Sequence, residues 1–121
     1  MSGSGAKKDL GRWGEDRAAV FLAEQGFTIV CRNYRNGRYG EIDIIAEKEG
    51  LLVFAEVKTR NCDFYGGSLY SISERKKATI RRCARRFLME NRRYNTTAVT
   101  CRFDLLYHEK GEIFWVEDII R

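Results

Sequence analysis

Hydrophobic residues near the start of the chain recur at helical spacing and predict a helix over residues 8–25. One face of this helix would contain Leu10, Trp13, Gly14, Ala18, Phe21 and Leu22. Gly26 is a helix stop signal, and the segment FTIVCRN at 27–33 predicts a strand that ends in polar residues. The small and polar residues 1–7 predict a flexible tail ahead of the helix.

Two apolar runs, IDIIA and LLVFAEV, flank Glu49-Gly50 and predict a β-hairpin with strands at about 39–47 and 51–59. Side chains alternate between the two faces of a strand, so a turn centred on these two residues makes one face wholly apolar. That face would contain Ile42, Ile44, Ala46, Val53, Ala55 and Val57. Another element of the fold has to cover it.

The second half of the chain begins with the signals of a long helix. Ser71 and Glu74 fit a capping box, and the helix after them would extend to about residue 93. Its apolar face would contain Ile72, Ile80, Cys83, Ala84, Phe87 and Leu88. We therefore expect one face of this helix to pack on the sheet.

Strands at about 99–108 and 112–119 would form a second hairpin around Lys110-Gly111. The predicted order is a helix, three strands, a helix and two strands. This order is typical of a mixed α/β (α+β) fold, in which helices flank a central and mostly antiparallel sheet. The chain has 121 residues, no proline and no low-complexity linker, so we expect a single domain over residues 8–121.

Composition indicates a soluble globular protein, with 44% hydrophobic and 32% charged residues. No apolar run approaches the roughly 18 residues of a membrane span, and the start of the chain lacks a signal-type apolar segment. Four cysteines, Cys31, Cys62, Cys83 and Cys101, lie too far apart for a zinc site. They predict reduced structural thiols, and hence a cytoplasmic protein without membrane partners.

Charged residues interrupt the first hairpin where core residues are expected. In the register centred on its turn, Asp43 lies directly opposite Glu56, and Glu41 lies opposite Lys58. Opposed side chains have Cβ atoms ~5 Å apart, so two carboxylates there repel each other unless a proton, a cation or a metal ion intervenes. An ion-pair network at the end of the sheet, with Lys58 bound to Glu41, would be a purely structural answer.

A divalent metal site is the chemical alternative. Two hard carboxylate oxygens, a carbonyl of the neighbouring strand and several waters suit octahedral Mg²⁺ or Mn²⁺. Lys58 lies two residues beyond Glu56 on the same face, where it could orient or deprotonate a water or steady a phosphate. Carboxylates, lysine and metal together favour phosphodiester hydrolysis over a salt bridge.

Basic residues concentrate in the second predicted helix and favour contact with nucleic acid. From Arg75 to Arg93, nine of them oppose Glu90 alone, a net charge of +8, whereas the other 13 basic and 16 acidic residues of the chain give −3. The nine are Arg75, Lys76, Lys77, Arg81, Arg82, Arg85, Arg86, Arg92 and Arg93. This distribution favours a surface that contacts the phosphate backbone, without reading bases. Arg35 and Arg38 would add positive charge near the acidic strand.

The sequence resembles a known group of nucleases at the residues already described. Asp43 followed by Glu56-Val57-Lys58 resembles the PD-(D/E)xK signature of restriction-endonuclease-like nucleases, with Ile42 in place of the proline. More closely, the chain is similar to the small bacterial YraN family, which is compared by fold with archaeal Holliday junction resolvases. GRWGEDRAAVFLAEQGF, GEIDIIA, VFAEVKTR and RFDLL match that family's pattern in order, over nearly the whole chain.

The resemblance implies a restriction-endonuclease-like fold and a metal-dependent nuclease. Asp43 and Glu56 would be metal ligands with the Val57 carbonyl as a third, and Lys58 would position the attacking water. Glu15 would complete the acidic shell from the first helix. The resemblance favours DNA with branched or flapped structure as the substrate, and a homodimer that cuts two strands symmetrically.

Two alternative functions are compatible with the same sequence. A nucleic-acid-binding module without activity, or an accessory subunit that needs a partner, would keep the same charges. Asp104 and Arg102 predict a structural ion pair, and His108, the single histidine, predicts a surface residue. In the loop at 61–71, aromatic residues would contact a ribose or base, or simply pack: Phe64, Tyr65 and Tyr70.

Overall fold

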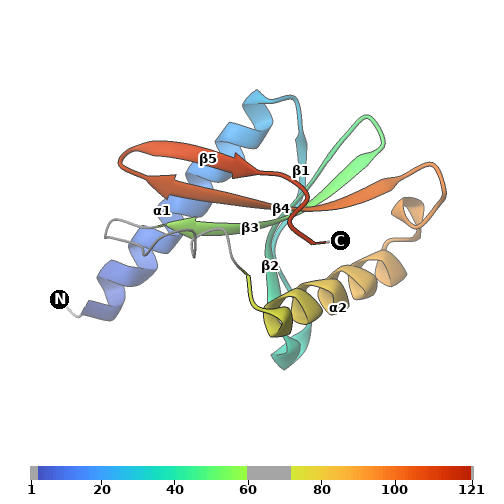
Figure 1. Ribbon diagram of the computed structural model, residues 1–121, viewed down its shortest axis with the longest axis horizontal. Helices are drawn as coiled ribbons and strands as arrows, with labels where there is room; N and C mark the ends of the chain where they lie inside the picture. The colour runs from blue at the N-terminus through green and yellow to red at the C-terminus, as the bar shows by residue number, and fades with distance from the viewer. Residues whose placement is uncertain (1–2, 60–71, 121) are drawn as a thin grey trace.

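The computed structural model describes residues 3–59 and 72–120, and these residues form the predicted mixed α/β fold (Figure 1). In chain order the main elements are α1 Gly3–Glu24, β1 Thr28–Arg35, β2 Glu41–Lys48, β3 Leu51–Thr59, α2 Glu74–Glu90, β4 Thr100–Glu109 and β5 Glu112–Val116. Two short 3₁₀ helices, η1 Gly37–Tyr39 and η3 Arg92–Tyr94, precede β2 and follow α2. This arrangement is consistent with a restriction-endonuclease-like fold.

The strands form one five-stranded sheet in the order β1-β2-β3-β4-β5. All neighbours are antiparallel except β3 and β4, which are parallel, so the chain crosses from one end of the sheet to the other between them. α2 belongs to this crossover. The first hairpin has the predicted register, because Ile44 pairs with Ala55 and Ile45 with Phe54.

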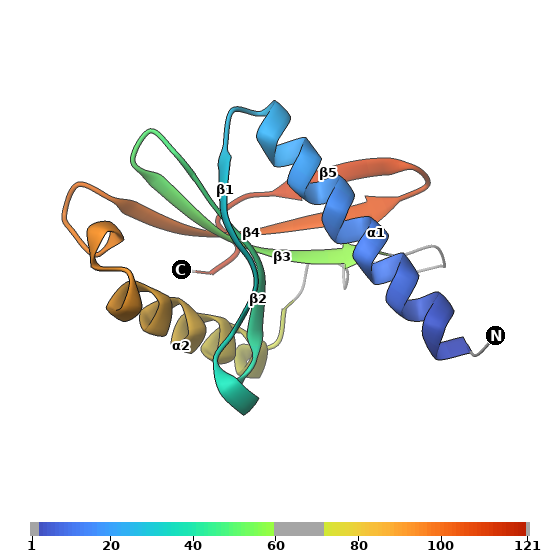
Figure 2. The ribbon, with the colours of Figure 1, turned by 180° about the vertical axis from the view of Figure 1, so that it is seen from behind.

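The two helices cover opposite faces of the sheet (Figures 1 and 2). On one face α1 closes a cluster formed by Ala18, Leu22, Phe27, Ile44, Ala46, Val53, Ala55 and Leu106. On the other face α2 closes a cluster formed by Ile42, Ile45, Leu52, Phe54, Cys83, Ala84, Phe87 and Tyr94. Ile42 was predicted to share a face with Ile44 but packs on the α2 side, because β2 no longer pairs with β3 beyond Ile44.

The ends of several elements differ from the prediction. α1 begins at Gly3 rather than at residue 8, so residues 3–7 are helical instead of forming a tail. Helix extension adds one hydrogen bond per residue once a helix has formed, and this outweighs the weak helix preference of the glycine- and serine-rich start. At the other end of the chain, β5 stops at Val116, because Asp118 adopts a left-handed conformation (φ 59°).

The cap of α2 also differs. Ser71 lies outside the described residues, and the N-cap is Ser73, whose Oγ accepts a hydrogen bond from the backbone N–H of Lys76 at 3.1 Å. Ser73 has the extended backbone of an N-cap, which makes Glu74 the first helical residue. α2 ends at Glu90, before η3. None of the described helices is both long enough and apolar enough to cross a membrane.

Candidate active site

The first hairpin opens at the end away from its turn, and Asp43 lies in that opening. The last residue pair joining β2 to β3 is Ile44–Ala55. Just beyond it, the backbone N–H of Val57 donates a hydrogen bond of 2.8 Å to Asp43 Oδ2. The carboxylate therefore satisfies a donor of β3 at the place where the two strands separate.

Asp43 is buried among negative charges. Only 8% of the residue is exposed, and burial, followed by the charge of Glu56, raises the pKa of Asp43 to about 7. The charges of Glu15 and Glu41 act in the same direction, whereas the hydrogen bond from Val57 lowers the pKa. At neutral pH the Asp43 carboxylate would therefore be stabilised by a nearby cation.

Glu56 lies on β3 next to the amino-terminal end of α2. Its side chain is 13% exposed, and its Oε1 lies 3.5 Å from Lys76 Nζ. Burial raises the pKa of Glu56, while Lys76 and then Lys58 lower it. The structure thus brings Asp43 and Glu56 together as predicted, although they are not a directly paired couple in the sheet.

Lys58 lies near Glu56, whereas Glu41, one possible ion-pair partner of Lys58 in the sequence, has a different cation beside it. Glu41 Oε2 instead lies 3.5 Å from Nε of Arg35. The reason is the sheet itself, because Glu41 pairs with Arg35 on β1 after β2 has separated from β3. Lys58 is half-buried, and its positive charge lowers the pKa of Glu56. Lys58 is therefore a cation close to Glu56.

Glu15 reaches the same region from α1. Its negative charge raises the pKa of Asp43, and its Oε1 lies 3.9 Å from Nη2 of Arg32, which also contacts Asp16 at 2.8 Å. A cleft of about 730 Å³ opens beside it, lined by Gly11, Arg12, Glu15, Asp16, Arg32, Asn33 and Arg35. Glu15 therefore contributes charge to the site from the wall of an open cleft.

The donor set fits a divalent ion of the magnesium type better than a densely coordinated metal. Among the described residues, no three Asp, Glu, His or Cys side chains are close enough together to hold a metal ion. Mg²⁺, however, commonly uses one or two protein carboxylates and fills its remaining positions with waters and substrate oxygens. Asp43, which is buried, and Glu56, whose charge raises the pKa of Asp43, meet that requirement.

The basic surface of α2 has the predicted orientation. Its apolar stripe is buried: Ile80, Cys83, Ala84 and Phe87. Four predicted phosphate contacts are exposed, namely Arg75, Arg82, Arg85 and Arg86, and three are half-buried, namely Lys76, Lys77 and Arg81. Arg35 and Arg38 are also exposed. The loop at 61–71, including its predicted aromatic contacts, lies outside the described residues.

Lys76 is the site residue whose role the sequence did not reveal. It was predicted only as one of nine basic residues, but it is the α2 lysine that contacts Glu56. Its position in the first turn of α2 could have indicated a contact with β3, because α2 is the next described element after β3 in the chain. The docking of α2 on the sheet, which no local pattern specifies, decides the contact.

The prediction for His108 is wrong, whereas the prediction for Asp104 is confirmed. His108 is buried, and its Nε2 lies 2.8 Å from the carbonyl oxygen of Gly14, because the amino-terminal half of α1 covers this part of β4. Asp104 is fully buried and accepts hydrogen bonds from Nε and Nη2 of Arg102 at 2.9 and 2.8 Å. Both residues are structural.

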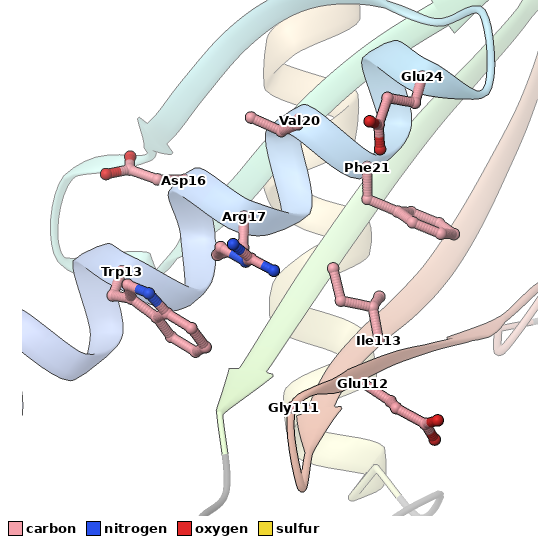
Figure 3. Close-up of a pocket in the computed structure, with 9 residues that line it drawn as sticks. All are labelled: Trp13, Asp16, Arg17, Val20, Phe21, Glu24, Gly111, Glu112 and Ile113. Atoms are coloured by element: carbon pink, nitrogen blue, oxygen red, sulfur yellow. The ribbon is translucent and has the colours of Figure 1, made fainter.

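A second cleft, of about 600 Å³, lies between α1 and the β4–β5 hairpin (Figure 3). Phe21 of α1 and Ile113 of β5 point toward one another in it, and Trp13 stacks at a tilt against His108 with ring centroids 5.2 Å apart. Its lining residues include none of the predicted ligands or Lys58. This cleft is therefore separate from the carboxylates of the candidate site.

Comparison with known proteins gives one family. The sequence model described as "Uncharacterised protein family UPF0102" matches residues 14–107. A UPF0102 protein of Desulforapulum autotrophicum is 45% identical over 112 residues, which cover 92% of this chain and 89% of that protein. A UPF0102 protein of Neisseria meningitidis is 39% identical over 110 residues (90% and 92%), and one of Shewanella baltica is 39% identical over 109 residues (90% and 96%).

Proposed function

We propose that this chain, which belongs to the UPF0102 family, is a Mg²⁺- or Mn²⁺-dependent nuclease that hydrolyses phosphodiester bonds in DNA. Family membership confirms the resemblance found in the sequence but names no activity. The observation that supports the proposal is the pair Asp43 and Glu56: burial raises the pKa of both carboxyls, and the charge of Glu56 raises the pKa of Asp43 further. A site of this kind favours a divalent cation.

In the proposed reaction each residue has one task. Asp43 and Glu56 would hold the ion, with the Val57 carbonyl as a further ligand, and Glu15 would add negative charge. A bound ion would supply Lewis acidity and a more acidic water. Lys58 would orient that water and stabilise the charge that develops on the phosphate.

The substrate is inferred from charge. The exposed arginines of α2 would bind phosphates along one strand, and Arg35 and Arg38, which precede β2, would add further phosphate contacts. Phosphate contacts position a duplex without specifying its sequence, so we favour recognition of branched or flapped DNA. A homodimer would place two such sites on one junction. The proposed location is the cytoplasm, where the free thiols of Cys31, Cys83 and Cys101 stay reduced.

A cleavage assay tests the proposal. Labelled linear, flapped and four-way-junction DNA would be incubated with the protein in Mg²⁺, Mn²⁺ or chelator. Lys58→Ala and Glu56→Ala should each lower the metal-dependent rate by roughly 100-fold or more. Lys48→Ala removes a lysine from the far end of β2 and serves as the matched control. DNA binding without cleavage by any of the proteins would contradict the stand-alone enzyme.

One observation favours the alternative of a binding module without activity. Lys76 contacts Glu56, and Arg35 contacts Glu41, so two carboxylates of the cluster already have cationic partners. In such a module the acidic cluster would be an ion-pair network, and DNA binding would not depend on metal. An accessory subunit would differ from it only by gaining activity when its partner is added.

A further inference from the structure

The start of α2 holds the backbone of Lys76 at the open end of the first hairpin. Its backbone N–H is bonded to the Ser73 cap, which sets the first helical turn. Three residues on, Thr79 contacts Gly40, where a Cβ would overlap the Thr79 methyl group and where the backbone has φ 126°. Residues three apart share a helix face, so this close approach also directs Lys76 toward β2 and β3.

In the contact between Lys76 and Glu56, the Glu56 side chain is buried more deeply than the Lys76 side chain. The Glu56 side chain is 13% exposed, whereas the Lys76 side chain is 41% exposed. A buried carboxylate is costly without a cation, but a half-exposed ammonium is hydrated when it leaves. Glu56 therefore depends on a counter-ion, and Lys76 is free to move away when another cation arrives.

Two other cations of α2 form ion pairs within the helix. Lys77 Nζ lies 3.2 Å from Glu74 Oε1, and Arg86 Nε lies 3.1 Å from Glu90 Oε2, both within the helix. Lys58 approaches Glu56 from the same strand, but it affects the pKa of Glu56 less than Lys76 does. Lys76 is thus a helix cation placed between Glu56 and the basic surface.

We propose that Lys76 is the internal counter-ion of Glu56 that a divalent metal ion displaces, and that its released ammonium then binds a phosphate oxygen of the DNA strand. The inference rests on the proposed function, because it concerns the same metal site and the same substrate. A single ammonium cannot serve both partners at close range, so metal binding and phosphate binding are coupled through this side chain. Metal entry would thereby raise the affinity of the site for DNA.

Calorimetric titration of the full chain with Mn²⁺ tests the first half of the proposal, the displacement of Lys76 by a metal ion. Lys76→Met removes the charge and keeps the aliphatic stem, and Lys48→Met is the same change at the far end of β2. We expect Lys76→Met to bind Mn²⁺ roughly three- to tenfold more tightly than the wild type, with Lys48→Met unchanged. Unchanged or weaker binding by Lys76→Met, while Glu56→Gln still weakens the wild-type site, would overturn the inference.

DNA affinity tests the second half in a Lys58→Ala background, which suppresses turnover. Fluorescence anisotropy with a labelled duplex should show that Lys76→Met weakens binding roughly three- to tenfold more in Mn²⁺ than in chelator. Lys76→Arg should restore most of the loss. An equal loss in both conditions would make Lys76 an ordinary backbone contact and overturn the coupling.

The possible outcomes distinguish a failure of this inference from a failure of the proposed nuclease activity. In one outcome, Lys76→Met binds Mn²⁺ more tightly and DNA affinity depends on metal, while the wild type cleaves no DNA. This result would support the inference and contradict the proposed nuclease activity. Cleavage that proceeds with no effect of Lys76→Met on metal or DNA affinity leaves the nuclease and removes the inference. Absence of Mn²⁺ binding in both the wild type and Lys76→Met removes both.

Discussion

Gly14 of α1 lies so close to Thr59 of β3 that a Cβ at position 14 would overlap the Thr59 hydroxyl. The same Cβ would meet Cδ2 of His108 at 3.4 Å, and the Gly14 carbonyl lies 2.8 Å from His108 Nε2. This contact sets how closely the helix approaches the sheet. Because Glu15 is the next residue, it also sets how closely that carboxylate approaches the acidic cluster.

Gly14→Ala should lower the free energy of unfolding by about 1–3 kcal/mol, because overpacking against β3 outweighs the better helix propensity of alanine. Urea denaturation measures the change. Gly11→Ala is the matched control, since a Cβ at Gly11 has open space and should stabilise the helix by about 0.5–1 kcal/mol. In combination with Thr59→Ala, Gly14→Ala should cost less than in the wild type; full additivity would argue against the overlap.

Asp43 should make the metal-free protein less stable as pH rises from about 4 to about 7. Burial raises the pKa of Asp43 to about 7, so in this window the folded state holds a proton that the unfolded state has already lost. The free energy of unfolding therefore falls with rising pH, by at most about 4 kcal/mol, and levels off above pH 7. Urea denaturation in chelator at several pH values measures this slope.

Asp43→Asn should flatten the slope, and Mg²⁺ should restore wild-type stability mainly above pH 7, where the carboxylate is charged and ready to bind. The raised pKa of Glu56 would leave a smaller slope of the same sign. A variant whose pH profile matches that of the wild type would show that Asp43 does not titrate as described.

Asp104→Ala should be among the most destabilising substitutions in the chain, at about 3–5 kcal/mol. The buried carboxylate also accepts hydrogen bonds from Trp115 Nε1 at 2.8 Å and from the Asp118 backbone N–H at 2.9 Å. Its removal leaves Arg102 half-buried without this partner. Glu117→Ala, at the exposed end of the same network, should cost less than about 1 kcal/mol. Equal losses in denaturation would contradict this ranking.

Arg85→Ala should weaken DNA binding nearly equally for all sequences and reduce the slope of log affinity against log salt by about one. Arg85 is exposed on the face of α2 opposite its buried stripe. Arg17→Ala, on α1 where Arg17 stacks over Trp13, is the matched control. Anisotropy titrations at several salt concentrations measure both slopes, and a slope unaffected by Arg85→Ala would place the DNA elsewhere.

The sequence was sufficient to predict the register of the first hairpin but not its end. The alternation in IDIIA and LLVFAEV fixes which residues face each other once the turn is located, and Ile44–Ala55 pairs accordingly. Alternation does not reveal where two strands separate, which is why Ile42 and Asp43 depart from the expected geometry. In the same way the basic stripe of α2 is a local pattern and was predictable from spacing.

Contacts between distant segments could not be predicted in this way. The approach of Lys76 to Glu56 depends on how α2 docks, and the burial of His108 depends on α1 passing over β4. Both contacts result from the packing of whole elements, for which a single chain gives no periodic signal. The carboxylate pair was accessible from the sequence because both residues belong to one hairpin.

The parallel pairing of β3 with β4 has a consequence for folding kinetics. Every pair along these strands joins residues 49 positions apart, from Leu51 with Thr100 to Thr59 with His108. Closing a loop of that length costs entropy before any contact repays it, so this pairing is expected to form late. The hairpin with its two carboxylates can form early, whereas Lys76 lies within the loop. During folding, the two carboxylates would thus come together before the Lys76 counter-ion arrives.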